Sequence, residues 1–232
     1  MRFRTLSAAL LVSALALAAC DSDNSTGLSG TSNNATVQFI NASNTSLDIA
    51  ANGTVATGNG ALSYGTAGSC MSVDATNSGL AVRTTGTSTA LTGFTPAFTA
   101  GGSYTVVAYP GTAGATQFAT VSNAFTPASG QAGLRVVNVG AAGSNYDVYV
   151  AAPGAALGTS SANNVGVGTG SSYFNVSATS AQHIAVTNAG SQQVVLDFGN
   201  SNTFTAGKKS TLVITAPAPG SSSPRGFIIP GC

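Results

Sequence analysis

The chain has 232 residues, of which only 6% are charged, with 7 Lys and Arg against 6 Asp and no Glu. An ordinary soluble domain carries about 25% charged residues, so solubility must come here from Ser, Thr, Asn and Gly. This charge balance excludes a basic surface of the kind that binds nucleic acid. The length is sufficient for one large or two small domains.

The N-terminal residues have the pattern of a secretory signal peptide. Two arginines precede an apolar run over residues 6–19, which is shorter than the roughly 20 residues that a membrane-spanning helix needs. The run ends in the sequence LAAC at residues 17–20, which resembles the lipobox of bacterial lipoproteins. We therefore predict a signal peptide at 1–19 and lipidation at Cys20. The alternative is an ordinary signal peptide that ends in Ala-x-Ala.

The next residues, 20–34, have the sequence CDSDNSTGLSGTSNN, whose low apolar content predicts a flexible tether after the lipidated cysteine. Removal of the signal peptide would leave five basic residues against six Asp, a net charge of −1. We expect an extracytoplasmic protein, lipid-anchored to the cell membrane or outer membrane. Its expected partners are the membrane, through the lipid, and an envelope protein or polysaccharide.

Two halves of the remaining chain share short blocks in the same order. The matching pairs are VQFIN at 37–41 with LRVVN at 134–138, LDI at 47–49 with YDV at 146–148, GTAGSCMSVDA at 65–75 with GTGSSYFNVSA at 168–178, LAV at 80–82 with IAV at 184–186, and FTAG at 98–101 with FTAG at 204–207. We interpret this order as a tandem duplication, with domains at 35–127 and 134–232 and a linker at 128–133. Chance similarity in a biased composition is the alternative.

Each half contains short strand patterns separated by turn signals. Residues 47–51 and 146–150 alternate with a period of two, which indicates half-buried strands. Residues 104–109 and 211–215 are rich in β-branched and aromatic side chains, and Asn-Gly, Ser-Gly and Gly-Gly pairs mark turns between such segments. The predicted fold class is all-β, with two tandem immunoglobulin-like antiparallel β-sandwich domains after the signal peptide.

Two cysteines remain once Cys20 carries the lipid. Cys70 and Cys232 form an even pair in a compartment that permits disulfides. A disulfide between them and a pair of free thiols are both consistent with the sequence.

The residues that carry catalysis are scarce. His183 is the single histidine, and no Gly-x-Ser-x-Gly motif accompanies it. Asp48 and Asp147 hold equivalent positions in separate halves, so we expect them to lie too far apart to act on one bond. We predict no enzymatic activity, no cofactor and no metal. The alternative is an extracytoplasmic hydrolase or sugar-processing enzyme that uses Asp147, Asp197 or His183.

Aromatic side chains are the remaining candidates for recognition. Tyr149 is the strongest, because strand alternation places it beside Asp147 on the face away from Val148. We predict surface recognition at Tyr149 and Asp147, within a non-catalytic binding or structural module. A pure spacer or assembly scaffold without a ligand is a further alternative.

The blocks LRVVN at 134–138, YDVYV at 146–150, and FTAG at 204–207 ahead of a strand at 211–213 are similar to the repeat of a bacterial family called domain of unknown function 4397. The resemblance covers most of 35–232 as two units, more clearly in the second. The first unit departs from the pattern at LDIA, residues 47–50. The resemblance implies a secreted, sandwich-like domain, often lipid-anchored or repeated, with no catalytic residue to transfer.

Overall fold

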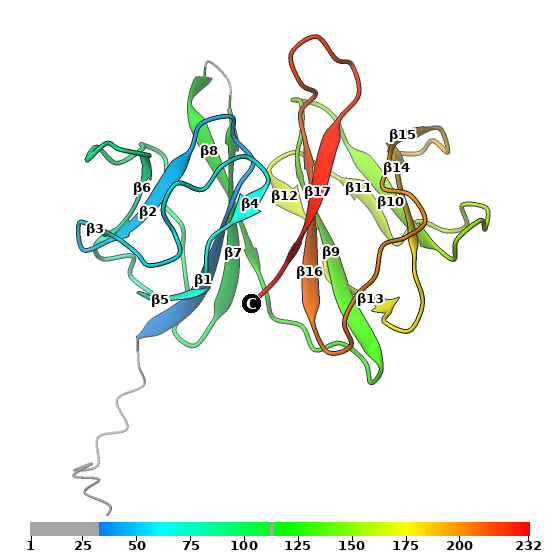
Figure 1. The fold of residues 1–232 in the computed structure, drawn as a ribbon, viewed down its shortest axis with the longest axis horizontal. Helices are drawn as coiled ribbons and strands as arrows, with labels where there is room; N and C mark the ends of the chain where they lie inside the picture. Colours follow the sequence, from blue (N-terminus) through cyan, green and yellow to red (C-terminus); the bar gives the residue numbers. More distant parts are fainter. Residues whose placement is uncertain (1–32, 112–113) are drawn as a thin grey trace, which may run out of the picture. The chain divides into compact units, whose positions relative to one another are not determined.

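The computed structural model describes residues 33–111 and 114–232 (Figure 1). The predicted signal peptide, Cys20 and the tether up to residue 32 lie outside the described residues. Within the described part no helix is long and apolar enough to cross a membrane. The structure confirms the all-β fold class, since every regular element of the described ranges is a strand.

Four sheets hold the strands. Sheet A consists of β1 (Asn34–Asn41), β4 (Thr66–Ala67), β5 (Met71–Asp74), β7 (Ser103–Pro110) and β8 (Thr116–Ser122); sheet B consists of β2 (Leu47–Ala51), β3 (Thr54–Val55) and β6 (Leu80–Thr84). Sheet C consists of β9 (Gln131–Val139), β12 (Thr169–Gly170), β13 (Phe174–Ser177), β16 (Lys209–Thr215) and β17 (Arg225–Pro230); sheet D consists of β10 (Tyr146–Ala151), β11 (Ala162–Val165), β14 (His183–Asn188) and β15 (Val194–Asp197). We call sheets A and B the first sandwich and sheets C and D the second.

The two sandwiches have corresponding strand orders. Sheet A runs β4-β1-β7-β8 with β5 also on β1, and sheet C runs β12-β9-β16-β17 with β13 also on β9. Sheet B runs β3-β2-β6, and sheet D runs β11-β10-β14-β15. At the places of β11 and β15, the first sandwich has single bridges, from Leu47 to Leu62 and from Arg83 to Ala90. The matching sequence blocks fall on corresponding strands or on the segments that lead into them.

Sheets A and C each contain one parallel strand pair besides the antiparallel pairs that the sequence led us to expect. β1 pairs in parallel with β7, and β9 pairs in parallel with β16. Parallel neighbours need a long crossover connection, and here that connection passes through the opposite sheet of each sandwich before it returns. Both sheets are therefore mixed.

The boundary between the halves also differs from the expected linker. β9 already begins at Gln131, so residues 131–133 of the expected 128–133 linker are strand. Gly133 lies in close contact with Phe125, because a Cβ at Gly133 would come within 2.9 Å of that ring. All described residues belong to a single compact unit.

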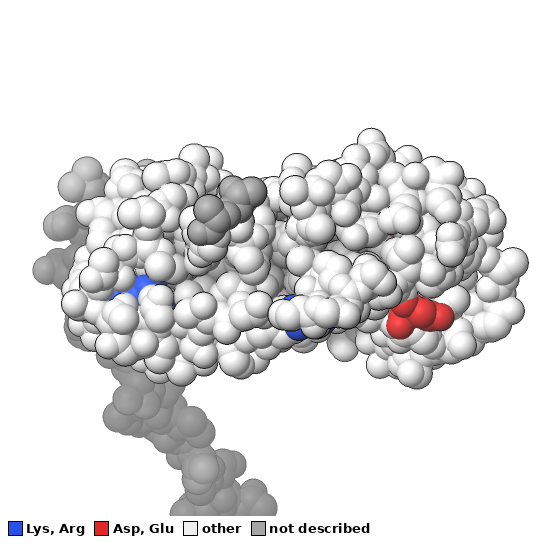
Figure 2. All heavy atoms as spheres, turned by 90° about the horizontal axis from the view of Figure 1, so that it is seen from above, with Lys and Arg blue, Asp and Glu red and all other residues white. Residues whose placement is uncertain are grey.

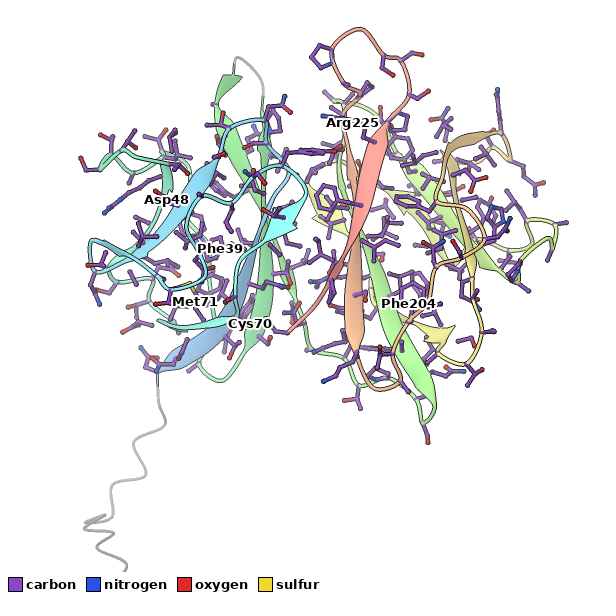
Figure 3. The ribbon with its side chains drawn as sticks, in the orientation of Figure 1. Phe39, Asp48, Cys70, Met71, Phe204 and Arg225 are labelled. Carbon is purple, nitrogen blue, oxygen red and sulfur yellow. A yellow bond between two sulfur atoms is a disulfide. The ribbon has the colours of Figure 1, made fainter. Side chains whose placement is uncertain are left out.

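Side-chain alternation explains how each sandwich is filled. In β1, Val37 and Phe39 point into the core between sheets A and B, and in β9 Leu134 and Val136 point into the core between sheets C and D. Met71 packs at the edge of the first core, and Phe204 packs at the edge of the second (Figure 3). The opposite faces of β1 and β9 are buried as well, which is the origin of the site described next.

Candidate functional site

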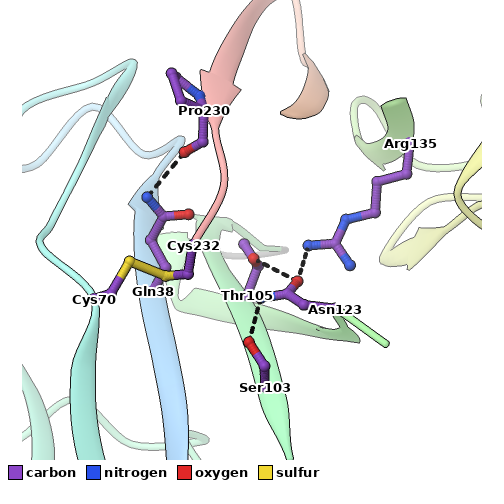
Figure 4. Close-up of a disulfide and its surroundings, with 8 residues drawn as sticks. All are labelled: Gln38, Cys70, Ser103, Thr105, Asn123, Arg135, Pro230 and Cys232. Atoms are coloured by element: carbon purple, nitrogen blue, oxygen red, sulfur yellow. Dashed lines mark hydrogen bonds between the residues drawn. A yellow bond between two sulfur atoms is a disulfide. The ribbon is translucent and has the colours of Figure 1, made fainter. Parts of the chain in front are cut away.

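Cys70 and Cys232 are joined by a disulfide, so the structure selects this arrangement over two free thiols (Figure 4). The Cα atoms are 6.0 Å apart and the residues are 162 positions apart in the chain. Cys70 lies between β4 and β5 of the first sandwich, and Cys232 follows β17 of the second. The bond therefore ties the two sandwiches together.

A third apolar core lies between sheet A and sheet C, and we call this contact region the seam. Its buried members are Ile40, Ala42, Val107, Tyr109, Ala119, Val137, Val139 and Val213, with Ala67, Val121, Phe227 and Ile229 packed at its edges. The seam explains why β1, β7, β9 and β16 are buried along most of their length, since both faces of these strands are covered. Sequence alternation alone does not show whether the second face meets water or protein.

Arg135 is the residue of the seam that sequence analysis did not single out. It is the largest of the fully buried side chains, at 1% exposure, and lies in β9 between Leu134 and Val136. Its Nε donates to Thr211 Oγ1 at 3.1 Å, and Nη1 donates to the carbonyl oxygen of Ser122 at 2.7 Å. The sequence signal that could have identified Arg135 is the presence of a charged residue between apolar residues of one strand.

Asn123 connects this arginine to the first sandwich. Asn123 Oδ1 accepts hydrogen bonds from Arg135 Nη2 at 2.6 Å and from Thr105 Oγ1 at 3.0 Å, and its amide nitrogen donates to Ser103 Oγ at 3.1 Å (Figure 4). The carbonyl oxygen of Asn123 accepts a bond from Lys209 Nζ at 2.8 Å. The cationic side chains of Arg135 and Lys209 belong to the second sandwich. They are thus bound by neutral oxygen atoms of Ser122, at the end of β8, and of Asn123, just after it.

Burial changes the protonation chemistry of this cluster. Desolvation lowers the pKa of Arg135 to about 10, opposed by the nearby Tyr173. The guanidinium carbon lies 4.6 Å from the centre of the Tyr173 ring, a cation–π contact. Burial, followed by the charge of Arg135, also lowers the pKa of Lys209. Arg135 remains charged at neutral pH and is stabilised by hydrogen bonds and an aromatic face.

The seam opens to solvent in a pocket of about 350 Å³ beside this cluster. Phe125 and Tyr173 stack in its wall with ring centres 5.3 Å apart, and Ser122, Ser171 and Ser172 add polar groups. Both Phe125 and Arg135 therefore lie against the Tyr173 ring in the wall of this pocket.

Arg225 lies at the other end of the seam (Figure 3), and Tyr64 packs against it. Tyr64 shares a hydrogen bond of 2.8 Å with Thr215 Oγ1, and its ring lies edge-on to Phe227. Arg225 lies 4.4 Å from the centre of the Tyr64 ring. Tyr64 therefore contributes to the seam.

The prediction of surface recognition at Tyr149 and Asp147 is wrong. Both residues are only 7% exposed, because β10 lies in the interior of sheet D, between β11 and β14. Asp147 Oδ1 accepts the N–H of Asn164 at 2.6 Å and Oδ2 accepts the N–H of Gly190 at 2.8 Å. The carboxylate thus ties β11 to the turn after β14, and the low exposure leaves neither residue as a free surface.

Asp48 makes the equivalent tie in the first sandwich (Figure 3). Its Oδ1 accepts the N–H of Ala61 at 2.7 Å and the hydroxyl of Thr85 at 3.1 Å, and Oδ2 accepts the N–H of Gly86 at 3.3 Å. The bond from Ala61 lowers the pKa of Asp48 below its ordinary value against the effect of burial, with help from Gly86, Thr85 and Arg83.

An asparagine makes a second equivalent tie in each sandwich. Asn41 Nδ2 donates to the carbonyl oxygen of Leu62 at 2.7 Å, and Asn138 Nδ2 donates to the carbonyl oxygen of Val165 at 2.9 Å. The Asn and Asp positions of the aligned blocks are thus loop anchors.

His183 and Asp197 are brought together by the pairing of β14 with β15. His183 Nε2 lies 3.0 Å from Asp197 Oδ1, on side chains that are 16% and 54% exposed. The same Asp197 oxygen accepts the N–H of Gly199 at 2.7 Å, and Asp147 already accepts two backbone N–H groups. Of the three residues that the alternative enzymatic function would use, the structure therefore brings His183 and Asp197 into contact. No group of three potential metal ligands occurs in the described ranges.

We predict that Asp48→Asn lowers stability at neutral pH, because the amide cannot replace a carboxylate that accepts three hydrogen bonds. A lowered pKa in the folded state means that this stability is present above the unfolded-state pKa of about 3.9 and is lost as pH falls through the folded-state pKa. Urea unfolding between pH 2 and pH 7 should show the two proteins converging at low pH. The control is Asp74→Asn, since exposed Asp74 bonds mainly within its own turn; a constant difference across the pH range would contradict the assignment.

We predict that Cys232→Ser lowers the free energy of unfolding by up to about 5 kcal/mol, because the disulfide closes a long loop in the unfolded chain. Urea unfolding with and without a reducing agent gives the measurement. The reduced wild-type protein should match the variant, and an unchanged midpoint in both would show that the seam alone holds the halves.

Comparison with known families gives one match. The family model described as domain of unknown function DUF4397 matches residues 35–149, which span the whole first sandwich and continue into β10. A search among curated proteins finds no matching sequence. The resemblance was expected to be clearer in the second half, whereas the match covers the first and only the beginning of the second. Over residues 35–149, the chain therefore resembles the DUF4397 family.

Proposed function

We propose that this chain is a non-catalytic, lipid-anchored protein of the cell envelope, whose two sandwiches act as a binding or structural module. The observation that carries this proposal is the Cys70–Cys232 disulfide across the seam. Disulfides between distant residues persist in oxidising, extracytoplasmic compartments. Cys20, in its lipobox-like context, then serves as the lipid attachment site.

The surface chemistry supports contact with neutral, hydrogen-bonding material. Lys, Arg, Asp and Glu are sparse on the face seen in Figure 2. The chain carries 29 glycines and many Ser, Thr and Asn residues, which offer hydrogen bonds without a strong field. Envelope polysaccharide and envelope proteins present matching groups.

The use of the acidic side chains supports a non-catalytic role. Asp48 and Asp147 each accept hydrogen bonds from two backbone N–H groups of separate segments. Asp197, besides His183, binds the N–H of Gly199 in the turn after β15. These carboxylates already accept hydrogen bonds from backbone N–H groups. A catalytic acid or base would have to break such bonds in order to react.

The binding half of the proposal is tested with the chain from Asp21 onward, immobilised and exposed separately to polysaccharide, peptidoglycan and membrane-protein fractions of the source cell. Saturable retention on one fraction, competed by the free chain, is the expected result. The control is the same chain after reduction and denaturation. Equal retention on native and denatured protein, or none, would remove the binding role and leave the spacer; hydrolysis of a fraction, abolished by His183→Ala, would favour the enzyme.

The anchoring half is tested by Cys20→Ala in the complete chain. We expect the wild type to incorporate a labelled fatty acid and to sediment with membranes, and the variant to lose both. Equal membrane association of the unlabelled variant would refute lipidation at Cys20.

A further inference from the structure

Contacts across the seam occur at equivalent places that are related by exchange of the two sandwiches. Gln38 and Arg135 hold the same position in the blocks VQFIN and LRVVN. Gln38 Nε2 donates to the carbonyl oxygen of Pro230 at 3.1 Å (Figure 4). Arg135 Nη1 donates to the carbonyl oxygen of Ser122 at 2.7 Å. Each side chain reaches from its own sandwich to the last residue of the edge strand of the other.

The two acceptors are themselves equivalent. Ser122 pairs with Tyr104 at the end of β8, and Pro230 pairs with Ser210 at the end of β17. Tyr104 and Ser210 correspond, since Thr105 faces Gln38 across the parallel pair in sheet A and Thr211 faces Arg135 in sheet C. The donor and the acceptor of the Gln38–Pro230 bond therefore correspond to the donor and the acceptor of the Arg135–Ser122 bond, with the two sandwiches exchanged.

The same relation holds at the other end of the seam. Tyr64 bonds to Thr215. The corresponding residues are Val167, one position before the glycine of its block, and Tyr109, four positions after Thr105. Val167 and Tyr109 line one pocket of about 300 Å³ between the sandwiches, and a Cβ on Gly168 would come within 2.9 Å of the Tyr109 hydroxyl.

The disulfide has a counterpart of different chemistry. Cys70 corresponds to Tyr173 in the aligned blocks, and Cys232, two residues after Pro230, corresponds to Ala124, two residues after Ser122. Ala124 and Tyr173 line the seam pocket of about 350 Å³. At one of the two equivalent places, the Cys70–Cys232 disulfide joins the sandwiches; at the other, Phe125 stacks on Tyr173.

Contacts in which residue i meets residue j, and the equivalent of j meets the equivalent of i, define the isologous interface of a two-fold dimer. We propose that the seam is an internal two-fold dimer interface, so that the sheet A face of one chain has the sheet C face of a second copy as a fitting partner. Residues 123–130 connect the two faces within one chain, and the disulfide holds that closed form. When the closed form is opened, two copies pair by exchanging halves.

Two variants of the chain without residues 1–20 test this proposal. The first carries Val107→Asp and Cys70→Ser, which damages its sheet A face and leaves Cys232. The second carries Val213→Asp and Cys232→Ser, which damages its sheet C face and leaves Cys70. Each Asp replaces a valine that is 0% exposed in the seam, so neither chain can close its own seam without burying an unpaired charge.

On mixing under oxidising conditions, we expect a disulfide-linked heterodimer, because the intact faces of the two variants can pair and bring Cys70 beside Cys232. Non-reducing electrophoresis with differently sized tags identifies it. The matched control keeps both valines and changes only the cysteines; its closed seams should give far less heterodimer. Unlinked monomers, homodimers alone, or equal yields in test and control would overturn the proposal.

A second variant remains informative if the aspartate chains do not fold. Ala124→Cys with Tyr173→Cys, in the chain that keeps Cys70 and Cys232, should form a second disulfide at the equivalent place. Peptide mass mapping without reduction detects it. Two free thiols at these positions, in protein whose natural disulfide is intact, would overturn the two-fold relation.

Discussion

The packing of sheet A against sheet C is the constraint on which the rest of the molecule depends. Val107, Val137 and Val213 are fully buried in the seam, although they point away from the core of their own sandwich. Separation of the sandwiches would expose these apolar faces to water, at a cost of about 25 cal/mol per Å². The seam therefore explains why the two sandwiches form one compact unit, and the disulfide adds a covalent tie at its edge.

Hydrogen bonds within the seam fix the orientation of one sandwich relative to the other. Hydrophobic burial alone is non-directional, whereas Arg135 has to meet particular oxygens of Thr211, Ser122 and Asn123. A shift of one sandwich along the other would break the bonds from the buried guanidinium to Ser122 and Asn123, which is costly. A module whose halves are fixed in this way presents its loops in one arrangement, a property that suits a binding or structural role.

The sequence allowed the strands and their inward faces to be predicted, because these follow from local alternation. Counting cysteines singled out Cys70 and Cys232 but left a disulfide and two free thiols as alternatives. The seam was beyond such reasoning, since alternation in 134–139 is the same whether Val137 meets water or a second sheet. Tyr149 was misjudged for the same reason: its position in the strand was right, but its surroundings depend on the covering of β10. Arg135 lies in the aligned block LRVVN. Its role could not be predicted, because its partner Asn123 lies beside the other sandwich and outside the aligned blocks. The Asn and Asp loop anchors were visible as repeated positions, and only the structure shows that they bind backbone groups.

Scanning calorimetry of the chain from Asp21 onward, with the disulfide reduced, tests the central claim that the seam makes one cooperative unit. The account predicts a single transition whose calorimetric and van't Hoff enthalpies agree. Two transitions, or a calorimetric enthalpy about twice the van't Hoff value, would show that the sandwiches unfold independently and that the disulfide alone joins them.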